Sequence, residues 1–223
     1  MSQQLILFAR HPVPGQTKTR LGAGIGMERA AQFAEAFLLD LLDELRSDAW
    51  HRTIAFSPKT AASRAWFAEC AVAEDTLWPQ PPQSLGSRLN SACEQAFTHA
   101  DRVVIVGADC PLLTAGLVHT AFEQLTHHDC VLGPASDGGY YLIGLRRPLP
   151  DLFTDIPWST AQVLPATLAR LVQLDATHWL LPERFDIDNI ADLERLRDAL
   201  CQTENAAART TCRRTSVLLE RHP

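Results

Sequence analysis

Arg102–Pro111, with the sequence RVVIVGADCP, is the stretch that decides the fold. Four consecutive β-branched residues, Val103 to Val106, form a short apolar run between polar and turn residues, which is typical of a strand buried on both faces of a sheet. Asp109 follows this strand, and in open α/β sheets ligands bind beyond the carboxyl ends of the strands. We therefore predict an α/β fold with Asp109 in its site. The alternative is that Asp109 caps a helix over Leu112–Thr126, because Asp is a favoured N-cap.

The chain has 223 residues, of which 46% are hydrophobic and 21% are charged. This length suits one sizeable core, so we predict a single domain over residues 1–201. Residues 202–223 show no sustained hydrophobic period, and we expect a mobile C-terminal tail there. The net charge of −6 argues against a nucleic-acid partner, because phosphate binding needs a concentrated basic face. Nothing in the sequence indicates an oligomeric state.

The beginning of the chain predicts a cytoplasmic protein without a membrane partner. Its first residues carry no basic segment, and the apolar run Leu5–Ala9 is far too short for a signal peptide or a membrane span. The six cysteines show no CxxC pair and no metal-ligand spacing, so they favour reduced packing residues over a zinc site or a disulfide framework. Cys110 is the exception to watch, because it lies next to Asp109.

Short apolar runs alternate with segments of helical periodicity along most of the chain, which predicts alternating strands and helices. The predicted strands are Gln4–Ala9, Thr53–Phe56, Val72–Trp78, Val103–Val106, Cys130–Gly133, Tyr140–Leu145 and His178–Leu181. The predicted helices are Glu28–Arg46, Thr60–Glu69, a helix from the N-cap Ser84 to His99, Leu112–Thr126, Pro157–Leu174 with Ser159 as its N-cap, and Ala191–Leu200.

The loop Arg10–Gly26 combines four glycines, two prolines and three cations near the carboxyl end of the first strand. Neither a Walker A loop nor a GxGxxG fingerprint fits, because Lys18 lacks the preceding glycine and Met27 stands where the last glycine belongs. Arg10, Lys18 and Arg20 still suit a pyrophosphate, since cations neutralise it and Arg binds two oxygens at once. The alternative is a solvated surface loop.

The sequence Asp137-Gly138-Gly139 precedes the predicted strand that starts at Tyr140. Asp-Gly is a strong turn signal, and as a turn the segment needs no function. Yet Tyr140 and Tyr141 are the only tyrosines of the chain and adjoin this turn, which favours a pocket where hydroxyls and a carboxylate orient a polar acceptor. Trp158 either lines that pocket or packs in the core.

Asp186 and Asp188 precede the last predicted helix. In an extended segment both side chains face the same way, so both could meet a cation held by Asp109. The alternative is that Asp188 caps the helix. Gly86 lacks a side chain and would permit the close approach of a ligand to the backbone.

Three blocks of the sequence resemble the bacterial radical-SAM/selenodomain-associated transferases, which are small glycosyltransferase-like members of the GT-A nucleotide-diphospho-sugar transferase superfamily. The resemblance covers Leu5–Leu200. Its blocks are Leu7–Leu21, then Val106–Pro111 with Gly133–Leu145, and finally Ile156–Thr160 with Phe185–Asn189. It implies a Rossmann-like three-layer α/β/α sandwich with a mixed sheet, which agrees with the predicted alternation of strands and helices.

The resemblance also implies roles for the matching residues. The nucleotide phosphates would be held by Ala9, Arg10, Gly15, Lys18 and Arg20. The base and ribose would lie near Leu85, Gly86 and Arg88. Mg²⁺ or Mn²⁺ would be bound by Asp109, with Asp188 as the distal ligand. The acceptor pocket would comprise Asp137, Gly138, Gly139, Tyr140 and Trp158.

Two departures from this family bear on the reaction. Arg10 stands where relatives usually have Lys, which keeps the charge. Asp109-Cys110-Pro111 has a single carboxylate where typical GT-A glycosyltransferases have Asp-x-Asp. The second feature, together with the Lys18 loop, is equally similar to nucleotidyltransferases such as the molybdenum-cofactor and phospholactate guanylyltransferases.

Our first hypothesis is transfer of a sugar from a nucleotide-diphospho-sugar to a small acceptor, with Asp137 as a general base or a sugar-binding carboxylate. The alternative is nucleotidyl transfer, in which a phosphorylated or carboxylated small molecule attacks an NTP and releases pyrophosphate. In both, Lys18 and Arg20 lie opposite the metal at Asp109 and offset charge on the leaving group. A nucleotide-binding module without turnover is the third hypothesis.

Overall fold

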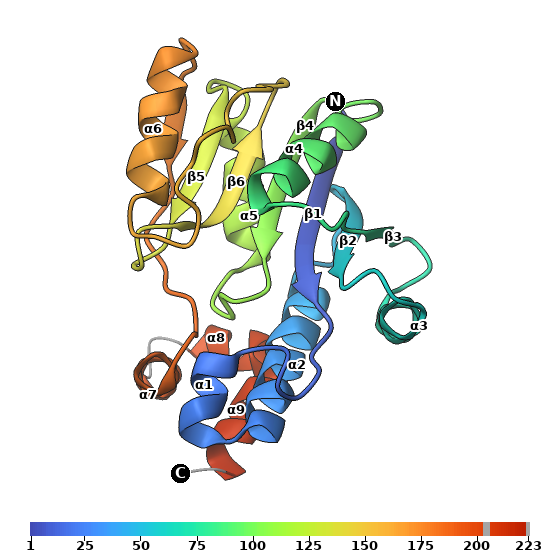
Figure 1. Cartoon of the computed structure of the whole chain (residues 1–223), viewed down its shortest axis with the longest axis vertical. Coiled ribbons are helices and arrows are strands. Elements are labelled where there is room, and N and C mark those ends of the chain that lie inside the picture. The colour runs from blue at the N-terminus through green and yellow to red at the C-terminus, as the bar shows by residue number, and fades with distance from the viewer. Residues whose placement is uncertain (203–205, 222–223) are drawn as a thin grey trace.

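The computed structural model describes residues 1–202 and 206–221 of the chain, and they contain one mixed seven-stranded sheet (Figure 1). The strand order is β3-β2-β1-β4-β6-β5-β7. All strands share one direction except β6, which is antiparallel to β4 and β5. The strands are β1 (Gln3–Arg10), β2 (His51–Ser57), β3 (Thr76–Pro79), β4 (Arg102–Gly107), β5 (Cys130–Pro134), β6 (Tyr140–Leu145) and β7 (His178–Leu180).

Helices cover both faces of this sheet. On β1, Leu5 and Leu7 belong to one apolar cluster and Ile6 to the other, as the alternation of side chains along a strand requires. The first cluster packs against α2 (Met27–Glu44), α3 (Ala61–Cys70) and α5 (Ala115–Gln124). The second packs against α4 (Leu85–Ala96) and α6 (Val163–Gln173). The predicted three-layer α/β/α sandwich with a mixed sheet is confirmed.

The central strand β4 is buried from both sides, as its β-branched run predicts. Val103 to Val106 are at most 4% exposed. Because β4 pairs in parallel with β1, the loops that follow these two strands emerge at the same edge of the sheet. The site must therefore be sought at this edge.

A third apolar cluster lies beyond that edge and forms the lower part of the molecule in Figure 1. Phe33 and Phe37, on the half of α2 that extends past the sheet, pack there against Leu21, Ile187 and Leu196. The surrounding helices are α1 (Thr19–Ile25), α7 (Ile190–Cys201), α8 (Ala206–Thr211) and α9 (Arg213–Arg221). Within the described ranges, no helix is both long and apolar enough to cross a membrane.

The helices α8 and α9 correct the prediction of a mobile tail from residue 202. The backbone N–H groups of Arg214 and Thr215 donate to the carboxylate of Asp40 on α2, at 3.0 and 2.9 Å. Leu219 is buried in the third cluster. These helices could not be predicted from the local sequence, because the residue that caps α9 is Asp40 of α2, which is distant in the chain. Residues 203–205 and 222–223 of the predicted tail lie outside the described residues.

Other element boundaries also differ from the prediction. Thr19–Ile25 is a helix within the predicted loop, and the fully buried Leu21 accounts for its docking despite three nearby glycines. The predicted strand Val72–Trp78 begins only at Thr76. The helix predicted from Pro157 begins at Val163, so Ser159 does not cap it. Pro165 lacks a backbone N–H, so a helix tolerates it only in the first turn. The helix that contains Pro165 therefore begins at Val163.

We predict that Asp40→Ala loosens the C-terminal helices. The change leaves the buried N–H of Thr215 and the partly buried N–H of Arg214 without their acceptor and should lower the free energy of unfolding by about 1–3 kcal/mol. Urea unfolding measures this loss, and amide exchange of residues 206–221 locates it. Asp43→Ala is the matched control, because Asp43 is half exposed and its carboxylate pairs with the guanidinium groups of Arg46 and Arg214. Equal effects of both variants would contradict the capping role of Asp40.

Candidate active site

A cavity of about 760 Å³ lies where the chain leaves β1 and β4 in opposite directions. From β1 the chain continues to β2 on one side, whereas β4 borders β6 on the other, so the loops diverge and leave a crevice. Phe8 to Arg10 and Ile105 to Asp109 line the cavity from the sheet. The cavity thus lies at the edge of the sheet where the sequence predicted a site.

Lys18 is the centre of charge in the cavity. Its Nζ lies 2.5 Å from Asp109 Oδ1 and 3.2 Å from Asp188 Oδ1, and its side chain is 6% exposed. Burial lowers the pKa of Lys18, but the charges and hydrogen bonds of the two carboxylates outweigh burial, so the pKa is raised overall. The ammonium group therefore stays charged and joins three segments that are distant in sequence.

Neither Asp109 nor Asp188 caps a helix. The side chain of Thr114 accepts the capping hydrogen bond of α5, at 3.3 Å from the N–H of Leu117. Asn189 caps α7. Both capping alternatives are therefore wrong, and the carboxylates of Asp109 and Asp188 are left to face Lys18.

Backbone hydrogen bonds fix the two loops that carry these carboxylates. The N–H of Ile187 donates to the carbonyl oxygen of Asp109 at 3.0 Å, which places Asp188 beside Asp109. The thiol of Cys212 donates to the carbonyl oxygen of Pro111 at 3.0 Å. The C-terminal helices thus support the Asp109 loop from below.

Asp186 adds a carboxyl group that is mostly buried. Burial, reinforced by the charge of Asp109, raises the pKa of Asp186 to about 7, while Lys18 opposes the shift and Asp137 and Asp188 add to it. The sequence paired Asp186 with Asp188, and the structure places both in the cavity wall. Asp186 thus brings a third carboxyl group within electrostatic reach of Lys18.

This donor set fits Mg²⁺ or Mn²⁺ when substrate phosphates complete the coordination. Mg²⁺ is commonly held by one or two carboxylates plus phosphate oxygens. Asp109 and Asp188 supply such a pair, and their side chains are 56% and 45% exposed. Among the described residues, no three His, Cys, Asp or Glu side chains are arranged to hold a metal ion.

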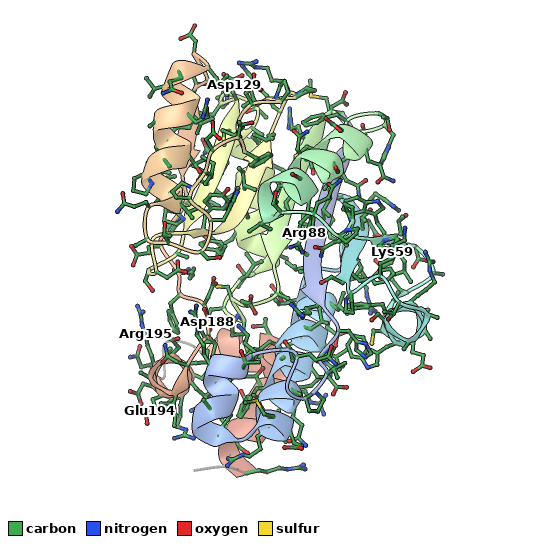
Figure 2. All side chains as sticks on the ribbon, viewed as in Figure 1. Lys59, Arg88, Asp129, Asp188, Glu194 and Arg195 are labelled. Carbon is green, nitrogen blue, oxygen red and sulfur yellow. The ribbon has the colours of Figure 1, made fainter. Side chains whose placement is uncertain are left out.

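The side of the cavity next to α4 carries cations. Arg88 donates to the side-chain oxygen of Gln80 at 3.0 Å and to the carbonyl oxygen of Gln83 at 3.0 Å. Gln80, which the sequence did not single out, is 5% exposed and is held in turn by the carbonyl oxygen of Ala55. Arg10 is exposed at the end of β1. Figure 2 shows Arg88 near the sheet and Asp188 near α7.

The sequence Asp137-Gly138-Gly139 forms the turn of the β5–β6 hairpin, as the turn alternative predicted. Asp137 Oδ1 accepts from the N–H of Gly139 at 2.9 Å, and Gly138 has a φ of 89°. A Cβ at Gly138 would lie 2.4 Å from the carbonyl oxygen of Ala161, so only glycine fits. Asp137 and Gly139 also line the cavity, so the turn does not exclude a role there.

Neither tyrosine hydroxyl is exposed to an acceptor substrate in the cavity, contrary to the sequence prediction. Tyr141 donates to the carbonyl oxygen of Pro182 at 3.0 Å, and burial raises its pKa to about 12. The hydroxyl of Tyr140 is buried, and burial raises its pKa above the usual value. The Tyr140 ring lines the cavity and meets Trp158 edge-on, with the two ring centroids 6.3 Å apart.

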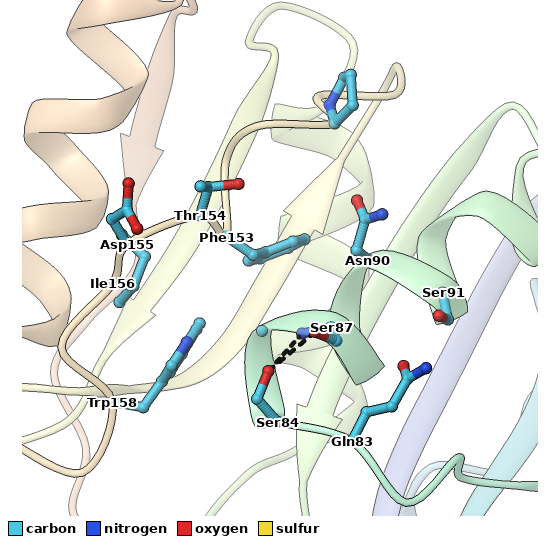
Figure 3. A pocket seen from close by; sticks show the side chains of 12 residues that line it. Gln83, Ser84, Ser87, Asn90, Ser91, Phe153, Thr154, Asp155, Ile156 and Trp158 are labelled. Carbon is cyan, nitrogen blue, oxygen red and sulfur yellow. Dashed lines mark hydrogen bonds between the residues drawn. The ribbon is translucent and has the colours of Figure 1, made fainter.

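Trp158 separates this cavity from a smaller one of about 540 Å³ between α4 and the β6–α6 connection (Figure 3). It both lines the main cavity and packs against core residues, so the two alternatives for Trp158 hold together. A Cβ on Gly86 would lie 2.8 Å from Trp158 Nε1. Gly86 thus permits the close approach of Trp158, where we had expected a ligand.

Most of the predicted site residues line the main cavity. They are Ala9, Arg10, Lys18, Arg20, Leu85, Arg88, Asp109, Asp137, Gly139, Tyr140, Trp158 and Asp188. Gly15, Gly86 and Gly138 are not part of its lining. Cys110 is buried, and burial raises the pKa of its thiol to about 12, so it is a packing residue.

Comparison with known proteins agrees with this architecture and site. The chain is similar over its whole length to the crystal structure of a protein from Desulfovibrio desulfuricans G20 described as a putative nucleotide-diphospho-sugar transferase. The identity is 31%, the TM-score is 0.89, and 100% of this chain and 99% of that chain are covered. The fold is therefore that of the nucleotide-diphospho-sugar transferases.

Residues 41–160 match the family model DUF2064, described as an uncharacterized protein conserved in bacteria, and the chain belongs to this family. It is also 35% identical over 140 residues to the 3-phospho-D-glycerate guanylyltransferase of Phenylobacterium zucineum, covering 60% of this chain and 62% of that protein. The chain thus spans less than two thirds of that relative. A cytidylyltransferase of Leptospira borgpetersenii shares the fold, with 13% identity, a TM-score of 0.60 and coverage of 100% and 98%. The narrower resemblance to radical-SAM-associated transferases stays a prediction.

We predict that Asp186→Asn stabilises the protein increasingly as the pH rises. Between about pH 4 and 7 the unfolded state releases the proton of Asp186 while the folded state keeps it, so the stability of the wild type falls across this range. Asn removes the titrating group. In EDTA, the melting temperature of the variant relative to wild type should rise by at least about 2–4 °C from pH 5 to pH 8.

The control for this titration is Asp155→Asn, at a side chain that is 86% exposed. It should leave the pH dependence of melting unchanged. A pH-independent difference between Asp186→Asn and wild type would contradict the raised pKa.

Proposed function

We propose that this protein is a metal-dependent nucleotidyltransferase that joins an NTP to a small phosphorylated or carboxylated acceptor and releases pyrophosphate. The observation that carries this proposal is the buried ammonium of Lys18, held between Asp109 and Asp188 in the crevice between β1 and β4. Its relatives are transferases, which supports a transferase reaction in this chain. The cytoplasmic location predicted from the sequence suits an enzyme that uses an NTP as its donor.

Both chemistries considered for this fold require a site that receives a polyphosphate, and the cavity suits one. Arg10, Lys18, Arg20 and Arg88 contribute positive charge to its wall. Arg10 is exposed, and Arg88 keeps the N–H groups that do not donate to Gln80 and Gln83, so both side chains can donate to phosphate oxygens. A bound Mg²⁺ or Mn²⁺ at Asp109 and Asp188 would supply Lewis-acid stabilisation of the phosphoryl charge.

In the proposed reaction an acceptor oxygen attacks the α-phosphorus of the NTP. The bond between the α-phosphorus and the bridging oxygen breaks, and that oxygen leaves with the pyrophosphate. Lys18 and Arg20 offset the negative charge that grows on the leaving group. A phosphate or carboxylate acceptor is already ionised at neutral pH, so the attack needs no general base at Asp137.

Glycosyl transfer from a nucleotide-diphospho-sugar is the second candidate, supported by the description of the relative that is 31% identical. Nucleotidyl transfer is preferred on two grounds. Asp109 is followed by a buried Cys110, so the loop offers one carboxylate where typical glycosyltransferases of this fold have two. The curated relative, at 35% identity, is a guanylyltransferase.

The released product distinguishes the two reactions. With Mg²⁺ or Mn²⁺, the purified protein is incubated either with each NTP and 3-phosphoglycerate or a related phosphorylated or carboxylated acceptor, or with nucleotide-diphospho-sugars. Nucleotidyl transfer releases pyrophosphate from one NTP, and we expect this result. Release of nucleoside diphosphate from a sugar nucleotide would instead establish glycosyl transfer. Asp137→Asn should lower the turnover strongly if the reaction is glycosyl transfer and only slightly if it is nucleotidyl transfer.

We predict that Asp109→Ala and Asp188→Ala each lower the turnover by a factor of about 10²–10³, as the loss of one preorganised charge does. Both side chains are about half exposed, so the variants should fold, with circular dichroism spectra like that of the wild type. Asp155→Ala, at an exposed carboxylate outside the main cavity, is the control and should retain full turnover. Full activity of either variant would refute the assigned roles.

A further inference from the structure

Lysine is rare in this chain, so a buried lysine in the cavity, Lys18, indicates that this position requires an ammonium group rather than a guanidinium. Only two of the twenty basic residues are lysines, Lys18 and Lys59, and the other eighteen are arginines. Lys59 is exposed on the surface, whereas Lys18 is 6% exposed between two carboxylates. An ammonium is a compact point charge, whereas a guanidinium is a planar fork that does not fit between two single oxygens.

The ammonium of Lys18 lies between the two carboxylates that would hold the metal ion. It lies 2.5 Å from an oxygen of Asp109 and 3.2 Å from an oxygen of Asp188. A divalent cation bound by the same two oxygens at about 2.0–2.1 Å would overlap this ammonium, so the two cations exclude each other. Lys18 also has a φ of 46°, a left-handed conformation that is uncommon for a residue other than glycine.

We infer that the ammonium of Lys18 occupies the cation site between Asp109 and Asp188 until the divalent cation binds, and then moves to the phosphates of the nucleotide. This exchange rests on the proposed function, because it takes the metal and the nucleotide as ligands of the cavity. When Lys18 leaves the carboxylates, its buried charge needs another anion. A polyphosphate in the same cavity supplies one.

The exchange makes the binding of metal and nucleotide synergistic. Without phosphate, Lys18 loses two ion pairs when the metal binds and gains none, which weakens metal binding. With phosphate present, Lys18 exchanges carboxylate oxygens for phosphate oxygens, and this penalty falls. Couplings of this kind typically change an affinity 5- to 150-fold.

Arg20 provides a matched control for the effect of charge alone. Its guanidinium lies 3.8 Å from the other oxygen of Asp188, and its side chain is 77% exposed. Replacing Arg20 removes one positive charge next to the same carboxylate without opening the cation site between Asp109 and Asp188. General electrostatics predicts some tightening of metal binding at both positions, smaller at the exposed Arg20, whereas the exchange predicts in addition that the effect at Lys18 shrinks when phosphate is present.

The first test measures Mn²⁺ binding by electron paramagnetic resonance in the absence of nucleotide. Lys18→Met should bind Mn²⁺ about 10-fold more tightly than the wild type, and Arg20→Met less than about 3-fold more tightly. Asp188→Asn in the Lys18→Met background should abolish this gain. Equal effects of Lys18→Met and Arg20→Met, or no gain in Lys18→Met, would overturn the inference.

The second test follows Lys18 in the unaltered protein by amine acylation and mass spectrometry, with exposed Lys59 as the internal reference. In EDTA, Lys18 should react much more slowly than Lys59. Saturating Mg²⁺ should raise the Lys18-to-Lys59 ratio several-fold, and inorganic pyrophosphate added with Mg²⁺ should lower it again. A ratio unchanged by Mg²⁺, with Mg²⁺ binding verified by calorimetry, would overturn the exchange.

Turnover measured on the same preparations separates the two proposals. Pyrophosphate release from an NTP with an unresponsive Lys18 would refute the exchange and leave the proposed function standing. A responsive Lys18 in a protein that turns over no NTP would support the exchange and refute nucleotidyl transfer.

Discussion

The ion pairs of one buried ammonium organise this protein. Lys18 follows β1, Asp109 follows β4, and Asp188 follows β7, so two salt bridges connect three segments that span most of the chain. A buried ion that loses its partners is costly, because it is then uncompensated in a medium of low polarity. The loops at this edge of the sheet are therefore held in one arrangement by the ion pairs of Lys18.

Much of the fold could be predicted from the sequence, because buried strands have a local signature. The run Val103–Val106 predicted the central strand, and the turn at Gly138 predicted the hairpin that makes β6 antiparallel. The helix starts were less accessible, since α6 begins where Pro165 and the packing of Ala161 against Gly138 allow it. Such a start depends on contacts between segments that no local pattern contains.

The site was predictable as a set of residues, but its geometry was not. The position of Asp109 after a buried strand predicted a site, and the loop after β1 predicted cations opposite it. The sequence could not tell that Lys18 contacts both carboxylates, that burial raises the pKa of Asp186 to about 7, or that Gln80 orients Arg88. Each of these properties arises from distances across the sheet edge.

The hydrogen bond from Cys212 to Pro111 ties the last helices of the chain to the loop of Asp109. During synthesis, domains generally begin to form from the N-terminal side. The last strand of the sheet, β7, and the helices that cover both faces of the sheet all precede residue 212 in the chain. A nascent chain that has not yet reached Cys212 therefore holds a nearly finished sandwich whose Asp109 loop still lacks this support.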